Sequence, residues 1–484
     1  MCYRDKSRLH WELQTADGVC PDMRQTAPLT LLVCGILALA GCVGTIGQTT
    51  TMTGGGGDSA GDAGNAGNAG NTGTTGLGGM SSVGGASGNP GAMGFPPGPL
   101  DLCDGMIQDK AAHPMTTLAK PALGAVVTEP QFNTQIRRIT AVPSGSGTPA
   151  IRPLYSTVSA WNADESRLLL LNVMGGRHEL YDGKTYAFIR GLVELNPPDV
   201  EQIFWHTTDP DLLLYVEGRN FIRYHVNEGR KETVTTFDFC SGGTPTGGSD
   251  PMFTSFDSNR FGLGCGGQVF IYDMASNTVI ARKTLSGNPA QIAPSGTLAY
   301  LSDNGDVTDA NLNVVRRLDL REPYGHASMG RWPTGEDTWN GQVFDEGPMG
   351  MSTDVGSLVT FDMTRGVSKT IIGPKTGYPY PPDGHVSAMA YRQPGWVVVS
   401  TFGKTSGAGL LDEEILIADT VSNKVCRVGR HRSWGKDNTM LGEAYWAEPH
   451  AVPSPTGTRI AFASDWGNGA TVDTYVLELP SYRP

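Results

Sequence analysis

The chain has 484 residues, of which 48 are acidic and 36 are basic, so its formal net charge is −12. This acidic balance argues against nucleic acid or an anionic membrane surface as the binding partner. No Cys-x-x-Cys pair occurs, which argues against a zinc site built from thiolates.

The N-terminal part has the pattern of a secretory signal. Arg24 precedes a run of a dozen mostly apolar residues, Leu29 to Ala40, and this run is shorter than the roughly 20 residues that cross a bilayer. We therefore expect a cleaved signal sequence, with a buried hydrophobic helix as the alternative. Residues 1–22 carry charges of both signs, and we interpret them as an extension from a misassigned start codon.

The apolar run ends in the sequence LAGC, with Cys42 as its last residue. This ending resembles a bacterial lipoprotein signal, in which the cysteine is lipidated and becomes the new N-terminus. The resemblance implies that residues 1–41 are removed and that Cys42 anchors the chain to a membrane. Val43, in place of Asp, implies an outer-membrane lipoprotein of a bacterial cell envelope, facing either the periplasm or the cell surface.

Residues 42–98 are dominated by Gly, Ser, Thr, Asn and Ala, with GNAGNAGN as a short repeat. So few apolar side chains cannot offset the entropy of the chain by burial, which predicts a disordered linker.

Residues 99–131 follow as a lead-in segment, and 132–484 as the folded domain. The roughly 380 residues after the linker exceed a usual single core of about 250–300 residues, but repeat folds escape this limit because each unit packs only on its neighbours.

Strand-like apolar runs recur in clusters of three or four, separated by Gly, Pro, Asn and Asp, and helical periodicity is nearly absent. This pattern predicts an all-β, seven-bladed β-propeller, with six or eight blades and a β-sandwich as alternatives. The clusters span 155–192, 202–237, 253–283, 290–318, 327–372, 386–428 and 446–480.

The last cluster has three strands, whereas the others offer up to four. The segment FNTQIRRIT, Phe132 to Thr140, alternates apolar and polar residues and has no partner of its own. We expect it to supply the missing strand and to close the ring, because a closed ring leaves no open edge between the first and last blades.

Four cysteines follow Cys42, an even number that suits an oxidising compartment. Cys240 and Cys265 flank a Gly-rich connection and could join neighbouring strands. Cys103 and Cys426 would then pin the lead-in segment to the propeller. Buried free thiols remain the alternative.

Histidines near the innermost strands share a spacing. His450, His326 and His385 lie 5, 7 and 9 residues before the turn proline of their own blades, and Gln291 lies 3 before its own. Because side chains alternate along a strand, these odd separations predict that all four point into the central channel. Counted to the turn glycine, His385 falls out of step, but the near-copies GHAS and GHVS place His326 and His385 alike in consecutive blades.

Three neutral imidazoles at a channel mouth suit a borderline divalent metal ion, with an amide or water oxygen completing its ligands. Such a site can leave one position open for substrate. The alternative is that these polar residues only bind buried water and one another.

The last blade carries SPTGTRIAFASD, Ser454 to Asp465, followed by TYVLEL, and it resembles the repeats of TolB-type propellers. Similar rings occur in oligogalacturonate lyases, in which three His and a Gln hold a manganese ion. The resemblance implies metal ligation by His326 and His450 and manganese as the cofactor. The second His of that family's last blade falls on Val452, and its Gln on Ala447, so His385 and Glu448 would have to take their places.

Those lyases remove a proton α to a uronate carboxylate, with a metal, a side-chain base and an arginine assisting. By this resemblance Arg392, Arg430 in the RHRSW cluster, and Tyr445 are candidate catalytic residues, and Tyr324 and Tyr391 could stack on a sugar. A solvated arginine or a tyrosine packed between blades is the simpler interpretation of each. The sequence thus predicts a lipid-anchored propeller that binds or cleaves an acidic polysaccharide, or alternatively a scaffold resembling TolB that binds an envelope protein or a glycan.

Overall fold

The computed structural model describes residues 100–145, 147–248, 254–285, 287–318, 326–343 and 356–483. Cys42, the signal region, the linker 42–98 and Tyr324 lie outside these residues. Within them the chain is all-β, and none of its helices is long and apolar enough to cross a bilayer. The only helical elements in this part of the chain are four short 3-10 turns: η2 (Ser302–Asn304), η3 (Pro374–Thr376), η4 (Gly435–Asp437) and η5 (Ala444–Ala447).

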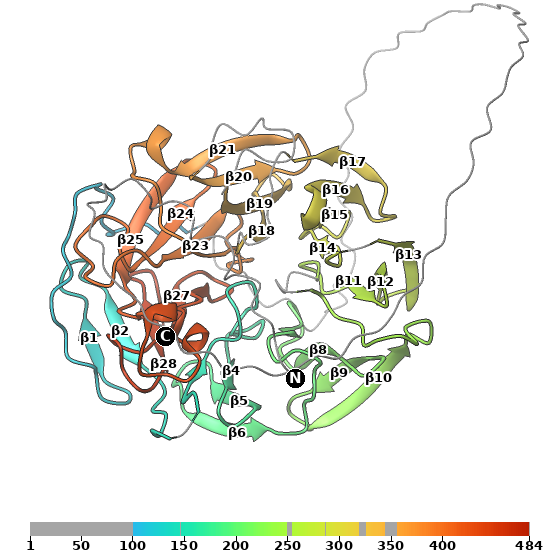
Figure 1. Ribbon diagram of the computed structural model, residues 1–484, viewed down its shortest axis with the longest axis horizontal. Coiled ribbons are helices and arrows are strands. Elements are labelled where there is room, and N and C mark those ends of the chain that lie inside the picture. Colours follow the sequence, from blue (N-terminus) through green and yellow to red (C-terminus); the bar gives the residue numbers. More distant parts are fainter. Residues whose placement is uncertain are drawn as a thin grey trace, which may run out of the picture. The chain divides into compact units, whose positions relative to one another are not determined.

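Seven sheets form the blades of a β-propeller around a central axis (Figure 1), which confirms the predicted fold class. We call the region around this axis, where the innermost strands lie, the channel. Blade 1 contains β3 (Ile151–Arg152), β4 (Arg167–Asn172), β5 (Arg177–Asp182) and β6 (Phe188–Leu192). Blade 2 contains β7 (Ile203–Trp205), β8 (Leu212–Glu217), β9 (Asn220–His225) and β10 (Arg230–Thr236). Blade 3 contains β11 (Arg260–Cys265), β12 (Gln268–Asp273) and β13 (Thr278–Thr284).

The remaining blades follow in chain order. Blade 4 contains β14 (Gln291–Ile292), β15 (Leu298–Leu301), β16 (Asp306–Asp309) and β17 (Val314–Arg317). Blade 5 contains β18 (Ser328–Arg331), β19 (Asp337–Gln342), β20 (Leu358–Asp362) and β21 (Val367–Ile372). Blade 6 contains β22 (Gly384–Ser387), β23 (Trp396–Thr401), β24 (Glu414–Asp419) and β25 (Lys424–Arg430). Blade 7 contains β26 (Val452–Pro453), β27 (Arg459–Ser464), β28 (Asp473–Glu478), β2 (Gln135–Arg138) and β1 (Val126–Thr128).

The core lies between blades, because each sheet packs its two faces on its neighbours. The second strands show this most clearly: every residue of β23, WVVVST, and of β27, RIAFAS, is buried. Continuous apolar runs of this kind are expected where both faces of a strand are covered. The outer strand β10, RKETVTT, is instead exposed at several of its positions.

Blade 7 closes the ring with strands from both ends of the domain. β2 pairs antiparallel with β28, with Ile136 opposite Leu477, so the segment predicted to supply the missing strand does so. β1 adds a fifth, outermost strand by pairing with β2. This strand falls in the predicted lead-in segment and was not expected.

Two innermost strands differ from the prediction. The first strand cluster was predicted to begin with a strand at Tyr155–Ser159, and this is wrong: β3 ends at Arg152, and Val158 N–H donates to the Tyr155 carbonyl across a turn (3.2 Å). In blade 3 no innermost strand is assigned within the described residues, and two isolated bridges, Thr246 to Gly264 and Thr254 to Phe261, take its place beside β11.

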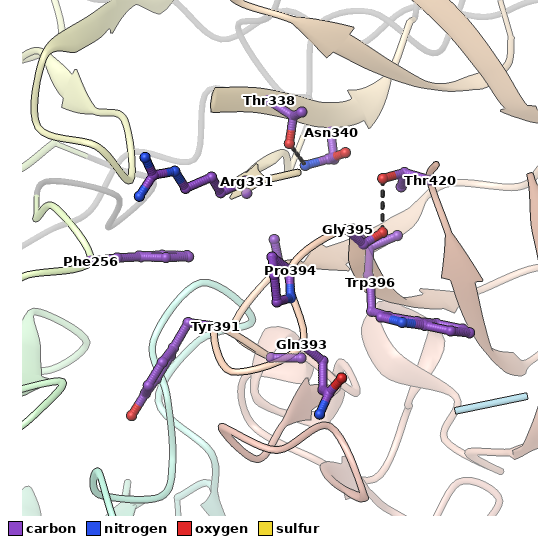
Figure 2. Close-up of a pocket in the computed structure, with 14 residues that line it drawn as sticks. Phe256, Arg331, Thr338, Asn340, Tyr391, Gln393, Pro394, Gly395, Trp396 and Thr420 are labelled. Carbon is purple, nitrogen blue, oxygen red and sulfur yellow. Dashed lines mark hydrogen bonds between the residues drawn. The ribbon is translucent and has the colours of Figure 1, made fainter. Parts of the chain in front are cut away.

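The turns between first and second strands lie at one end of the channel. Figure 2 shows the turn of blade 6, where Thr420 Oγ1 donates to the Gly395 carbonyl (2.8 Å). Tyr391, Gln393 and Trp396 from this segment line a cavity together with Phe256 and Arg331 from other blades. We call this end of the channel the turn end.

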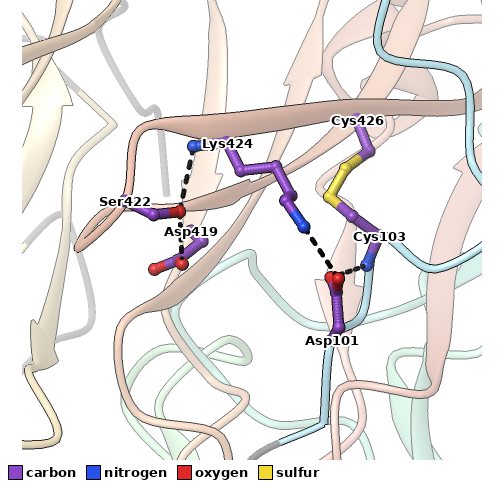
Figure 3. The surroundings of a disulfide bond; sticks show 6 residues. All are labelled: Asp101, Cys103, Asp419, Ser422, Lys424 and Cys426. Carbon is purple, nitrogen blue, oxygen red and sulfur yellow. Dashed lines mark hydrogen bonds and ion pairs between the residues drawn. A yellow bond between two sulfur atoms is a disulfide. The ribbon is translucent and has the colours of Figure 1, made fainter.

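The lead-in segment runs along the outer edge of blade 6. A disulfide joins Cys103 to Cys426 on β25, with 5.7 Å between the Cα atoms, and Lys424 pairs with Asp101 at 2.7 Å (Figure 3). A second disulfide joins Cys240 to Cys265, with a Cα separation of 5.6 Å. These are the two pairs that the sequence suggested. The first ties the lead-in segment to β25 of blade 6, and the second ties the segment after blade 2 to β11 of blade 3.

Candidate metal centre

Three histidines lie at the end of the channel where the innermost strands of blades 5, 6 and 7 begin. His385 is the second residue of β22, and His326 and His450 each stand two residues before the innermost strand of their blade. The ring centroids of His385 and His450 are 3.7 Å apart, and those of His326 and His385 are 4.4 Å apart. His385 is therefore in contact with both other imidazoles, and the three rings converge as the histidine spacing predicts.

The backbone route to this contact differs from the one assumed. His326 and His450 have φ angles of 41° and 39°, in the left-handed region that non-glycine residues seldom adopt. Regular strands therefore do not extend through them, and the alternation argument applies only to His385. Backbone strain of this kind is concentrated at functional sites, and here it turns two rings toward the third.

Glu448 joins the histidines and forms the candidate ligand set. It follows η5, and its Oε2 lies 3.5 Å from His450 Nε2 and 3.7 Å from His385 Nε2. One ligand atom from each of His385, Glu448 and His450 lies within 4.8 Å of the others. His326 contacts this group but is not part of it. Gln291 is buried on β14 of blade 4, and its Oε1 has no hydrogen-bond partner.

The ring nitrogens of this group fit a metal ion. His385 and His450 are 0% exposed, and none of their four ring nitrogens has a hydrogen-bond partner. Burial lowers the pKa of both histidines well below the usual range, and the neighbouring Arg152 and His326 lower it further. They are therefore neutral at physiological pH, the form that binds a divalent cation.

Burial also changes the acids of the site. It raises the pKa of Glu448 to about 7, against the opposing effect of His326 and Arg152. Without a metal ion, a carboxyl group with this pKa is about half protonated near neutral pH. A bound cation stabilises the charged carboxylate in place of the water that burial excludes, so the group then becomes an effective ligand.

Arg152 is a residue of this site that the sequence did not reveal. It is 0% exposed on β3, and its two terminal nitrogens have no hydrogen-bond partner. Tyr445 and Trp446 lie against the guanidinium, each ring centroid 5.5 Å from its central carbon. Because the predicted strand began at Tyr155, Arg152 fell outside it. An arginine at the start of an innermost strand is the only pattern that could have indicated it.

Tyr445 lies beside the histidine cluster, and it makes defined contacts there with Glu201 and His450. Its hydroxyl donates to Glu201 (2.9 Å), and its ring lies 5.5 Å from that of His450. Burial raises the pKa of Glu201 to about 8, while Arg152 opposes this rise. Glu201 precedes β7 of blade 2 and was also missed by the sequence analysis.

Two predicted catalytic arginines lie elsewhere. Arg392 is in the turn after β22, seven residues beyond His385, and seven residues of extended chain cover roughly 20 Å. Arg392 therefore belongs to the turn end. Tyr391, suggested for stacking, lines the cavity there.

Arg430 ends the outermost strand β25 and is held by structural contacts. It pairs with Glu414 at 3.3 Å, and its guanidinium donates to the carbonyls of Asp412 and His113. These contacts tie the lead-in segment to blade 6 and give Arg430 no part in the histidine cluster.

Comparison with known proteins identifies the fold. No family model and no curated protein matches the sequence. Among solved structures, an oligogalacturonate lyase in complex with manganese is similar with a TM-score of 0.53 and 15% identity, over 74% of this chain and 96% of that chain. An oligogalacturonate lyase from Vibrio parahaemolyticus is similar with a TM-score of 0.53 and 14% identity, over 74% of this chain and 99% of that chain. At this identity the likeness shows a shared propeller fold.

Proposed function

We propose that the chain is a metal-dependent polysaccharide lyase that acts on a uronate-containing, acidic glycan. The observation that supports it most is the set of four unpartnered imidazole nitrogens on fully buried His385 and His450, beside the carboxyl group of Glu448. The fold likeness to an oligogalacturonate lyase in complex with manganese points to the same chemistry and to manganese as the ion.

In this proposal His385, Glu448 and His450 hold the ion, with His326 and Gln291 as further ligands from neighbouring blades. A bound divalent cation would supply the positive charge that neutralises a uronate carboxylate and acidifies the proton α to it.

Arg152 is suited to bind the negative charge of the substrate. Its two free terminal nitrogens can donate to both oxygens of one carboxylate, or to the enolate that forms when the α proton leaves. The aromatic rings of Tyr445 and Trp446 keep its guanidinium in place. An unpaired buried guanidinium is costly in the free protein, and a bound anion removes that cost.

Glu201 is suited to accept the proton. A pKa of about 8 is close to the operating range expected of a general base near neutral pH. The Tyr445 hydroxyl donates a hydrogen bond to Glu201 (2.9 Å) and holds the carboxyl group in place, and the charge of Arg152 acts on the same carboxyl group. Deprotonated Glu201 then removes the α proton, a double bond forms between the α and β carbons as the bond from the β carbon to the glycosidic oxygen breaks, and the leaving oxygen takes a proton from water.

The test is incubation of the purified chain with polygalacturonate, alginate and glycosaminoglycans in the presence of Mn²⁺. We expect growth of the ultraviolet band of an unsaturated uronide, with loss of that activity in His385→Ala. The matched control is His206→Ala, because His206 lies in a turn of blade 2 where its Nδ1 accepts from Asp209 N–H (3.1 Å). A metal-loaded chain that cleaves none of these polymers would contradict the proposal.

A non-catalytic binding or scaffold propeller is the second candidate. Full burial of His385 and His450 favours it, because a buried ion between blades 6 and 7 would also serve to hold the ring together. Stabilisation by Mn²⁺ without cleavage, together with retention of an acidic glycan or an envelope protein, would select this function.

We further propose that the protein is an outer-membrane lipoprotein anchored through Cys42. The LAGC ending of the signal and the polar residues 43–98 support this location. Incorporation of labelled fatty acid into the wild-type chain, and its loss in Cys42→Ala, tests the anchor. Fractionation of the labelled protein with the inner membrane would contradict the outer-membrane assignment.

A further inference from the structure

Tyr155 contacts all three histidines from the other side of the channel. It follows β3 of blade 1 and is 3% exposed. Its ring centroid lies 4.6 Å from that of His450, 5.7 Å from that of His385 and 6.5 Å from that of His326. One side chain of blade 1 thus packs on residues of blades 5, 6 and 7.

Its hydroxyl distinguishes His326 from the other two histidines. Tyr155 Oη lies 2.9 Å from His326 Nδ1, whereas the ring nitrogens of His385 and His450 have no hydrogen-bond partner. Of the three histidines, only His326 has on one ring nitrogen the kind of hydrogen bond that orients many metal-binding histidines and sets their tautomer. His326 has such a bond, and it lies against the group that forms the candidate ligand set.

We infer that Tyr155 is the positioning residue that makes His326 a metal ligand, an inference that rests on the proposed function. His326 Nδ1–H donates to the Tyr155 oxygen, and Nε2 keeps the lone pair that binds a cation. The opposite arrangement, in which the hydroxyl donates to Nδ1, would leave the proton on Nε2 and prevent ligation.

The backbone of His326 explains why such a residue is required. With a φ of 41°, His326 stands in the left-handed region just before β18. Its carbonyl accepts a hydrogen bond from Val386 N–H of blade 6 (3.2 Å), and its ring is held by Tyr155 of blade 1. Two other blades therefore orient His326, blade 6 through the main chain and blade 1 through the imidazole.

The variant Tyr155→Phe isolates the hydroxyl, because the phenyl ring retains the packing against His385 and His450. We expect the affinity for Mn²⁺, measured by calorimetric titration of the metal-free chain, to fall about ten- to a hundredfold, as is typical when the residue that orients a metal-binding histidine is removed. The gain in melting temperature on adding Mn²⁺ should shrink accordingly.

The variant His326→Ala and the double variant Tyr155→Phe/His326→Ala show whether Tyr155 acts on the affinity for Mn²⁺ through His326. If Tyr155 acts on this ligand, the double variant binds Mn²⁺ no more weakly than His326→Ala alone. Additive losses would mean that Tyr155 acts on packing, and they would overturn the inference. The matched control is Tyr475→Phe, which removes a buried hydroxyl without a hydrogen-bond partner from blade 7 and should leave the affinity unchanged.

Failure of the inference and failure of the proposed function give different results. A wild-type chain that binds no Mn²⁺ would remove the metal site and with it the proposed function. A wild-type chain that binds Mn²⁺ with the same or lower affinity than Tyr155→Phe would leave the site intact and overturn only the role of Tyr155.

Discussion

Two regions of the propeller bury arginines and acidic groups, and they differ in how these groups are partnered. Beneath the lead-in segment, Arg427 pairs with Glu414 (2.5 Å) and Arg432 pairs with Glu129 (2.9 Å). Every side-chain nitrogen of these two arginines donates a hydrogen bond. In the histidine cluster, the terminal nitrogens of fully buried Arg152 have no hydrogen-bond partner.

This difference distinguishes buried charged groups that stabilise the fold from buried charged groups that are free to bind a ligand. A buried polar group left without a partner costs on the order of 1–3 kcal/mol, and a bound ligand that supplies the missing hydrogen bond or coordination removes that cost. Arg427 and Arg432 beneath the lead-in segment have all their partners within the chain and therefore hold the fold together. The ring nitrogens of His385 and His450 and the terminal nitrogens of Arg152 lack such partners, and in the proposed function the metal ion and the substrate supply them.

Removal of Arg427 should have the largest effect. Arg427→Met leaves Glu414 buried with one fewer partner, and the free energy of unfolding should fall by about 3–5 kcal/mol. Urea denaturation measures it, with Arg230→Met as the control, because Arg230 pairs with Glu228 in an exposed position and its loss should change stability little. An equal, small change in both variants would contradict the structural role of the buried pair.

Glu201→Gln should change how stability depends on pH. The pKa of Glu201 rises from 4.5 to about 8 on folding, so the native state binds the proton more tightly than the unfolded state does. Stability therefore falls as pH rises from 4.5 to about 8. Glutamine removes this loss, which amounts to a few kcal/mol at most.

The measurement is denaturation of metal-free protein at pH 5 and pH 9. At pH 9 the variant should be more stable than the wild type, and at pH 5 the gap should narrow. Parallel pH profiles for the two proteins would show that Glu201 is not buried as a neutral acid.

Arg152→Met should have a smaller effect, and it should act on binding. Loss of hydrogen bonds to a charged ligand weakens binding by about 1.5–3 kcal/mol, which corresponds to a KM for polyuronide raised about ten- to a hundredfold. The metal-free variant should be at least as stable as the wild type, because an unpaired buried charge has been replaced by an apolar chain. A destabilisation as large as that of Arg427→Met would show that Arg152 is a structural residue.

Local sequence pattern was sufficient for the fold and for part of the site. The alternation in FNTQIRRIT and the three strands of the last cluster predicted how β2 closes blade 7 against β28. The spacing of His326, His385 and His450 indicated their convergence, although the φ angles of two of them show that regular alternation was not its cause.

The residues that the sequence could not reveal owe their roles to contacts across the channel. Arg152 lies in a two-residue strand, too short to carry a periodic pattern, and Glu201 precedes a strand of three residues. Tyr155 meets His326 although 171 positions separate them. Arg430 was misassigned because an arginine near the last blade looks the same in sequence whether it is free or paired with Glu414.

The most direct test of the unpartnered histidines is anomalous diffraction from crystals of the chain grown with Mn²⁺. The account predicts one strong peak about 2.1 Å from a ring nitrogen of both His385 and His450, with Glu448 beside it, and no peak in His385→Ala. If His385 and His450 are ordered in crystals that contain Mn²⁺ and no anomalous peak lies between their rings, the proposed metal site is contradicted.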